Sequence, residues 1–93
     1  MKFNKRLREL RKLRGVTARE VSEETGVSAS YLGNLEAGRV ITASDDVIIK
    51  LASYYGVNAD ELLCEAGRVP FDIVRLLMKQ PELCHRIRQL AEA

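Results

Sequence analysis

The 93-residue chain has little of what enzymes and metalloproteins need. It contains one histidine, His85, and two cysteines, Cys64 and Cys84, with neither the CxxC spacing of a redox motif nor that of a zinc site. Four zinc ligands therefore cannot be assembled within one chain. It also shows no serine or cysteine nucleophile motif, Gly-rich phosphate loop or paired-carboxylate pattern. We expect no enzyme activity, catalytic residue, metal or cofactor, and two reduced cysteines that behave as small buried hydrophobic residues.

Long apolar runs and strand patterns are missing as well. No run approaches the roughly 18 residues of a membrane span, and the basic N-terminus MKFNKRLREL lacks the apolar core and cleavage site of a signal peptide. The composition, 46% hydrophobic and 30% charged, is typical of a soluble globular protein. We expect an all-α protein in the cytoplasm that does not bind membranes.

Charge is distributed unevenly along the chain. Residues 1–20 hold eight Lys/Arg and two acids, residues 21–64 hold two and seven, and residues 65–93 hold five and four. A basic first segment beside an acidic middle suits docking onto a polyanion with one face, although a solvated helix surface would carry the same charges.

The segment 17–38 has the pattern of two short helices joined by a tight turn. Thr17 and Glu20 form a capping box, and Gly26 can adopt the left-handed conformation that ends a helix. Ser28 is a second N-cap, opening a helix over 29–36 that ends at Gly38. This arrangement is a helix-turn-helix, which presents its second helix to the DNA major groove.

Three further helices are predicted within residues 1–66, over about 3–14, 45–55 and 59–64. Ser44 and Asn58 are the N-caps of the last two, and residues 39–43, which have no strong period, are expected to form a loop. The helix over 3–14 is predicted from an apolar stripe of Phe3, Leu7, Leu10 and, at its edge, Leu13.

Residues 67–93 are predicted to form a two-helix extension. Pro70 and Pro81 precede its two helices, and apolar residues cover most of the circumference of the helix over 71–79. Such a helix cannot stay exposed in a soluble monomer. It either packs back on the first and fifth helices or forms the centre of a homodimer, which we favour. The expected dimerisation residues are Phe71, Val74, Leu77, Met78, Leu83 and Ile87.

Four segments, in this order and spacing, resemble the lambda-repressor-like, or Xre/Cro, helix-turn-helix family over about residues 3–64. They are LRELRKLRGVTARE, the turn at 25–27, SASYLGNLEAG and YYGVNADELL. The resemblance implies a five-helix DNA-binding domain that binds double-stranded operator DNA as a dimer and regulates transcription. We expect a repressor.

By position, the resemblance assigns DNA contacts to the helix over 29–36 and its flanks. Asn34 is the expected base reader, because its amide can both donate to and accept from adenine. Arg39 is expected to contact phosphate. The full expected set is Ser28, Ala29, Ser30, Tyr31, Gly33, Asn34 and Arg39. Ser28 is also an N-cap, and Tyr31 is equally well explained as a packing residue.

Other positions are expected to be structural or to depart from the family pattern. Arg11 and Glu36 occupy positions where related repressors form an ion pair between the first and third helices. Ala18 stands where the family often has Gln, and Gly33 would admit close approach of DNA or of a neighbouring helix. With few long side chains on this helix, specificity is expected to rely on Asn34, thymine methyl contacts and DNA shape. The first helix also carries basic residues expected to be solvated or to touch phosphate: Arg8, Lys12 and Arg14.

A protein-interaction module is the alternative function. The helix-turn-helix would then be a scaffold, and the apolar C-terminal helices would bind a protein partner, as in an antitoxin that neutralises a toxin. The basic first helix favours DNA, whereas an exposed apolar extension favours a protein partner. An antitoxin could do both.

Overall fold

The computed structural model describes residues 2–40 and 43–92, which form seven helices and no strand. The expected all-α fold is therefore confirmed, and the helices lie close to their predicted bounds. Residues 41 and 42 of the expected loop lie outside the described part of the chain. The helices are α1 (Lys2–Arg14), α2 (Ala18–Thr25), α3 (Ala29–Glu36), α4 (Asp45–Tyr55), α5 (Ala59–Glu65), α6 (Phe71–Lys79) and α7 (Glu82–Glu92).

Side-chain caps determine where α2 to α5 begin. Thr17 Oγ1 accepts a hydrogen bond from the Glu20 amide at 3.1 Å, and the Glu20 carboxylate accepts from the Thr17 amide at 3.3 Å, which completes the predicted capping box. Gly26 ends α2 with φ of 78°, a conformation that glycine adopts at little cost. A side-chain oxygen likewise accepts from the amide three residues later at Ser28, Ser44 and Asn58.

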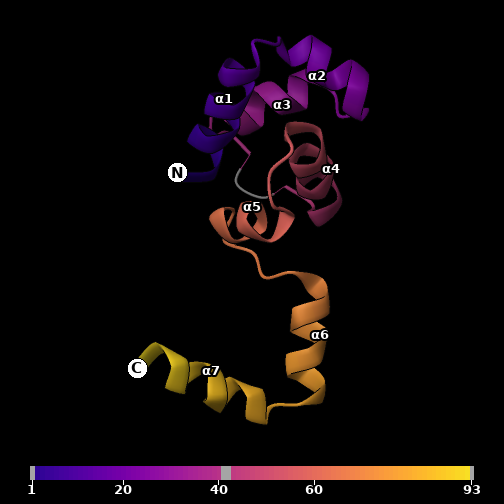
Figure 1. The fold of residues 1–93 in the computed structure, drawn as a ribbon. Coiled ribbons are helices and arrows are strands. Elements are labelled where there is room, and N and C mark those ends of the chain that lie inside the picture. The colour runs from indigo at the N-terminus through magenta and orange to yellow at the C-terminus, as the bar shows by residue number, and fades with distance from the viewer. Residues whose placement is uncertain (1, 41–42, 93) are drawn as a thin grey trace.

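The hydrophobic core lies where α1 to α5 converge (Figure 1). α1 packs against α3, α4 and α5, while α2 packs against α3 and α4, and α4 against α5. The largest fully buried side chains come from all five helices: Leu7, Val21, Leu35, Ile48, Leu51 and Leu62.

Leu13 is the exception in the predicted stripe of α1. Its side chain is 86% exposed, whereas Phe3 and Leu7 are 3% and 2% exposed. At about 100° per residue, Leu13 lies roughly 80° around the helix from Phe3, beyond the buried face. Placing Leu13 in the stripe was therefore wrong.

The cysteines also differ from expectation. Both are free thiols, but Cys64 is exposed and Cys84 only partly buried. α5 turns Leu62 and Leu63 into the core, and the next residue consequently projects outward. The expectation that both cysteines are buried was wrong.

α6 and α7 form an arm that projects from the five-helix core (Figure 1). The radius of gyration is 15.4 Å, whereas a compact domain of this length would have about 12 Å. α7 packs against α6, and the arm does not fold back along α1. Of the helices described, none is long and apolar enough to span a membrane.

Arg68 fastens the base of this arm to the core. Its Nη1 donates to the Ala43 carbonyl at 3.0 Å, and its Nε lies 2.8 Å from Asp45 Oδ1. The linker between α5 and α6 is therefore tied to the start of α4, which orients the first turn of α6 relative to the core.

Candidate nucleic-acid interface

The turn between α2 and α3 is held by local hydrogen bonds. Thr25 Oγ1 donates to the Val21 carbonyl at 2.8 Å and accepts from the Val27 amide at 3.2 Å. Val21 and Val27 are themselves buried in the core. The turn is thus fixed on both sides, and α3 has a defined angle to α2.

One face of α3 is open to solvent. Ser28, Ser30 and Gly33 are exposed on it, and Asn34 is partly buried beside them. Leu32 and Leu35 point the opposite way, into the core. The structure also gives half-buried positions to Ala29 and Tyr31, and Tyr31 packs against the core.

Ser28 combines two roles at the start of α3. Its Oγ accepts from the Tyr31 amide at 3.1 Å, which caps the helix. Since a hydroxyl group also carries one hydrogen, Ser28 can donate to a second group while it caps. A phosphate oxygen at this helix N-terminus would be a suitable acceptor.

Asn34 and Arg39 are joined by a contact that sequence reasoning missed. Arg39 Nη1 donates to Asn34 Oδ1 at 3.3 Å, and the Arg39 amide donates to the Asn34 carbonyl at 2.9 Å. The side-chain oxygen of the expected base reader therefore accepts one of its two possible hydrogen bonds from the expected phosphate ligand. The two positions belong to one exposed cluster at the end of α3.

Gly33 faces open space. A Cβ atom added to this residue would meet nothing within 4 Å. Close approach of a neighbouring helix therefore does not explain this glycine, and that alternative was wrong. Close approach of a molecule from outside remains as an explanation.

Arg11 and Glu36 form an ion pair that joins α1 to α3. Arg11 Nε lies 2.9 Å from Glu36 Oε2, and Arg11 Nη2 lies 2.9 Å from Oε1, so the guanidinium contacts both carboxylate oxygens. Glu36 is only 7% exposed. Hydrogen bonding to this carboxylate raises the pKa of Arg11. The contact orients α3 from behind and leaves its exposed face free.

The end of α3 receives further donors from α1. Asn4 Nδ2 and Arg8 Nη2 donate to the Glu36 carbonyl at 3.3 and 3.1 Å. A cation at a helix C-terminus also interacts favourably with the helix dipole. Arg14 donates to the Tyr54 carbonyl and lies over the Tyr54 ring at 4.5 Å. The expectation that Arg8 and Arg14 are solvated or phosphate-bound missed these contacts.

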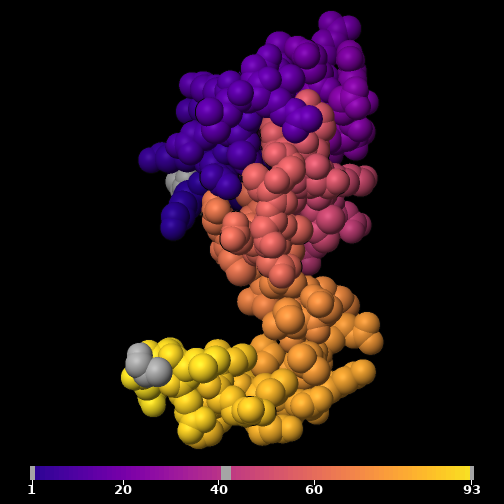
Figure 2. Space-filling view, viewed as in Figure 1, coloured from indigo at the N-terminus to yellow at the C-terminus, as the bar shows by residue number. Residues whose placement is uncertain are grey.

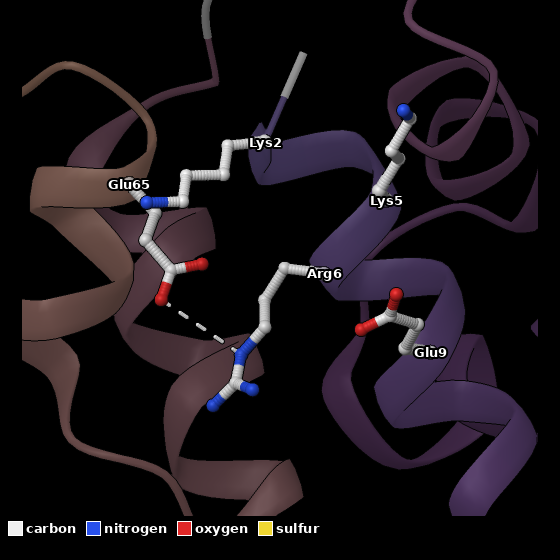
Figure 3. A pocket seen from close by; sticks show the side chains of 5 residues that line it. All are labelled: Lys2, Lys5, Arg6, Glu9 and Glu65. Atoms are coloured by element: carbon white, nitrogen blue, oxygen red, sulfur yellow. Dashed lines mark ion pairs between the residues drawn. The ribbon is translucent and has the colours of Figure 1, made fainter.

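A shallow pocket beside α1 holds the remaining arginine of that helix. Figure 3 shows Arg6 reaching from α1 toward α5, where its Nε lies 3.8 Å from Glu65 Oε1. Each arginine of α1 therefore contacts another helix. The exposed positive charges of α1 without such a contact among the described residues are its lysines, Lys2, Lys5 and Lys12.

A family model described as "Helix-turn-helix" matches residues 7–62. This chain belongs to the lambda-repressor-like helix-turn-helix family. The match covers the second half of α1, all of α2, α3 and α4, and the first half of α5, and stops before the arm. The helix-turn-helix of this family is a DNA-binding element. Within the described ranges no cluster of three His, Cys, Asp or Glu side chains is placed to hold a metal.

Two regulators resemble the chain over the helix-turn-helix domain. HTH-type transcriptional regulator DdrOP3 of Deinococcus deserti is 40% identical over 63 residues, which cover 68% of this chain and 48% of that protein. Uncharacterized HTH-type transcriptional regulator RghRB of Bacillus subtilis is 31% identical over 67 residues, covering 72% of this chain and 48% of that protein. The chain thus spans about half the length of these relatives.

A segment of an enzyme matches as well. Glutamine–fructose-6-phosphate aminotransferase of Methanocaldococcus jannaschii is 31% identical over 58 residues, but these make up 5% of that protein. So short a segment of a large enzyme carries no argument about catalysis in this chain.

Proposed function

We propose that the protein is a cytoplasmic, sequence-specific transcriptional regulator that binds operator DNA as a homodimer and represses by occupying it. The observation that carries this proposal is the exposed face of α3. It presents Ser30, Gly33 and Asn34 to solvent on a helix that the Thr25 turn and the Arg11–Glu36 pair hold from behind. A recognition helix needs such a rigid, uncovered face to enter the major groove.

Asn34 and Arg39 would act together in this mechanism. Recognition of adenine uses both the oxygen and the nitrogen of the amide. In the free protein Arg39 donates to that oxygen. On DNA, Arg39 would move to a phosphate, and Asn34 Oδ1 would become free to accept from the base. Base reading and phosphate binding are then linked at one end of α3.

The exposed surface area supports the homodimer. The chain exposes 6467 Å², whereas a compact monomer of this mass would expose about 5,400 Å². The excess, about 1,000 Å², is larger than the roughly 800 Å² that each partner buries in a standard interface. Much of it is apolar, with Phe71 and Met78 of α6 being 65% and 76% exposed. Dimerisation would give two recognition helices for half-sites about 34 Å apart.

A toxin-neutralising or other protein-binding role is the second candidate, and the same apolar arm favours it. A different protein could cover this surface in place of a second copy. Co-purification of the tagged protein from its native host separates the two, since a stoichiometric heterologous partner at the arm would favour the second candidate.

Asn34→Ala and Arg39→Ala test the DNA-binding proposal by fluorescence anisotropy on DNA from upstream of the protein's own coding sequence. Asn34→Ala should weaken specific binding about 5- to 150-fold, because a bidentate base contact contributes about 1–3 kcal/mol. Arg39→Ala should weaken binding to all sequences and lower the slope of log K against log salt by about 1.

Glu24→Ala in α2 serves as the control, because Glu24 is exposed and makes no ion pair among the described residues. It should bind like the unmodified protein or slightly better. The assignment of Asn34 fails if its replacement lowers the melting temperature instead of the affinity. An unchanged salt slope would remove Arg39 from the phosphate contacts.

A further inference from the structure

A groove opens where the first turns of α4, α5 and α6 meet. Its volume is about 420 Å³, and its lining includes the apolar side chains Ile49, Leu63 and Phe71. Ile49 and Phe71 are 46% and 65% exposed, so much of this apolar surface is open to water. A surface of this kind, recessed and apolar, is typical of a docking site for apolar side chains of a partner.

Carboxylates line the groove beside these apolar residues. Asp46, Asp60 and Asp72 are exposed there, one from each of the three helices, and none forms an ion pair within the described residues. The fourth carboxylate, Asp45, is already paired with Arg68. An occupant should therefore bring apolar side chains flanked by positive charge.

α7 has this pattern. Leu83, Ile87 and Leu90 follow one another at helical spacing and form a stripe along the helix. At about 100° per residue Arg86 lies beside that stripe, whereas Arg88 lies about 130° around the helix from it, and neither is ion-paired in the part of the chain described. Ile87 and Leu90 are 50% and 76% exposed. α7 therefore carries an apolar stripe that is largely exposed, with Arg86 on its flank.

Within one chain this helix and this groove are kept apart. Among the helices, α6 is the one against which α7 packs extensively. Figure 2 shows an open notch between α7 and the five-helix core, with α6 at its side. Arg68 holds the start of α6 against α4, so the groove exists before any partner arrives. The complementary surface of α7 is consequently available to another molecule.

We infer that two copies exchange α7: the α7 helix of each copy lies in the groove between α4, α5 and α6 of the other. The inference rests on the proposed homodimer and names its contacts. Leu83, Ile87 and Leu90 cover Ile49, Leu63 and Phe71, while Arg86 lies among Asp46, Asp60 and Asp72. A two-fold axis repeats both contacts, as in a closed isologous dimer.

Charge reversal in the full chain tests the exchange by sedimentation equilibrium. The groove variant is Asp60→Lys/Asp72→Lys and the helix variant is Arg86→Glu. Each alone should raise the dimer dissociation constant at least tenfold, because every contact in its homodimer joins like charges. Mixed in equal amounts, the two variants should form a heterodimer of nearly unmodified affinity, because both of its contacts then join opposite charges.

Two controls change the charge in the same direction on nearby positions outside the contact. Glu61→Lys reverses the neighbouring charge in the first turn of α5 outside the groove, and Arg88→Glu reverses an arginine on the face of α7 away from the stripe. Both should dimerise normally, and circular dichroism verifies that all variants are folded.

Three outcomes would overturn the exchange. Normal dimerisation of both variants excludes the groove while leaving the homodimer intact. Monomeric variants that do not recover on mixing would show that the charges act within one chain. An unmodified protein that stays monomeric would contradict both the exchange of α7 and the homodimer. DNA binding is measured separately and tests the recognition helix.

Discussion

Glu36 concentrates several structural roles in one residue at the end of α3. Its carboxylate pairs with Arg11, and its carbonyl accepts from Asn4 and Arg8. All three donors lie on α1, so this residue determines how α3 sits against α1. The orientation of the exposed face of α3 therefore depends on contacts made on the opposite, buried side of the helix.

Replacing Arg11 by Met should destabilise the protein by about 3 kcal/mol, because it leaves the carboxylate of Glu36 buried without its partner. Urea denaturation measures the loss. Arg19→Met is the matched control, since Arg19 forms an exposed pair with Glu23 at 3.6 Å, and such pairs contribute little. Arg11→Met/Glu36→Leu should recover most of the loss. Equal effects of Arg11→Met and Arg19→Met would contradict a structural role for the pair.

Gly33→Ala should separate stability from function. Alanine has the higher helix propensity, and the added Cβ meets no atom within 4 Å, so the free energy of unfolding should rise by about 1 kcal/mol. DNA affinity should fall, because the methyl group would stand between α3 and the groove. Thermal melting and anisotropy report the two effects. A variant that is both more stable and equally active would show that DNA does not approach Gly33 closely.

Tyr55 gives the protein an alkaline sensitivity. Burial, and secondarily the charge of Glu36, raise the pKa of Tyr55 to about 12 from its ordinary value of 10. Folding therefore favours the neutral form of Tyr55. The free energy of unfolding keeps its full value below pH 10, where the tyrosine is neutral in both states, and falls as the pH rises toward 12, because the tyrosine of the unfolded chain ionises first. Because the ring is only partly buried, the loss should be about 1 kcal/mol, less than the full shift implies. Tyr55→Phe should flatten the stability curve between these pH values, and an unchanged curve would contradict the assignment.

At the scale of helices, what the sequence predicts depends on how local the cause is. Ser28 caps α3 through an amide three residues away, so the start of α3 is readable from the chain. The Arg8 bond to the Glu36 carbonyl joins residues 28 positions apart, and it depends on how α1 crosses α3. No local pattern specifies that crossing. The Arg11–Glu36 contact was expected only because the chain resembles a family in which it occurs.

The candidate site shows the same division. The exposed serines and Asn34 of α3 could be located from the cap and the inward spacing of Leu32 and Leu35. The bond between Arg39 and Asn34 could not, because it requires the chain to turn back at the end of α3, beyond the last periodic residue. The sequence indicated only that the helix ends at Gly38, and this glycine does adopt a left-handed conformation, with φ of 75°.

The arm also belongs to this scale, since α6 has no buried residue while α1 to α5 each have at least one. Leu77→Asp should dissociate the homodimer, because it places a charge in the apolar face of α6, while the five-helix core stays folded. Lys79→Asp, on the polar side of the same helix, is the matched control. Sedimentation velocity distinguishes them, and a Leu77→Asp protein that remains dimeric would reject the arm as the interface.

At the scale of the whole molecule, the basic character of α1 has a different meaning from the one its composition suggested. Its arginines tie α1 to α3, α4 and α5, so they stabilise the domain that holds α3. In the proposed function, binding to DNA would rest on α3, Arg39 and exposed lysines. The domain presents α3 at one end of the molecule and the arm at the other (Figure 1), which would allow DNA binding and dimerisation to use separate surfaces.

The most direct test is sedimentation velocity of the protein with fluorescent DNA from upstream of its own coding sequence, over a series of salt concentrations. We predict one complex containing two protein chains per DNA, with an affinity that falls steeply as salt increases and that Asn34→Ala reduces. A protein that forms no complex even at low salt, or one whose complex is insensitive to Asn34→Ala, would contradict the role proposed for α3.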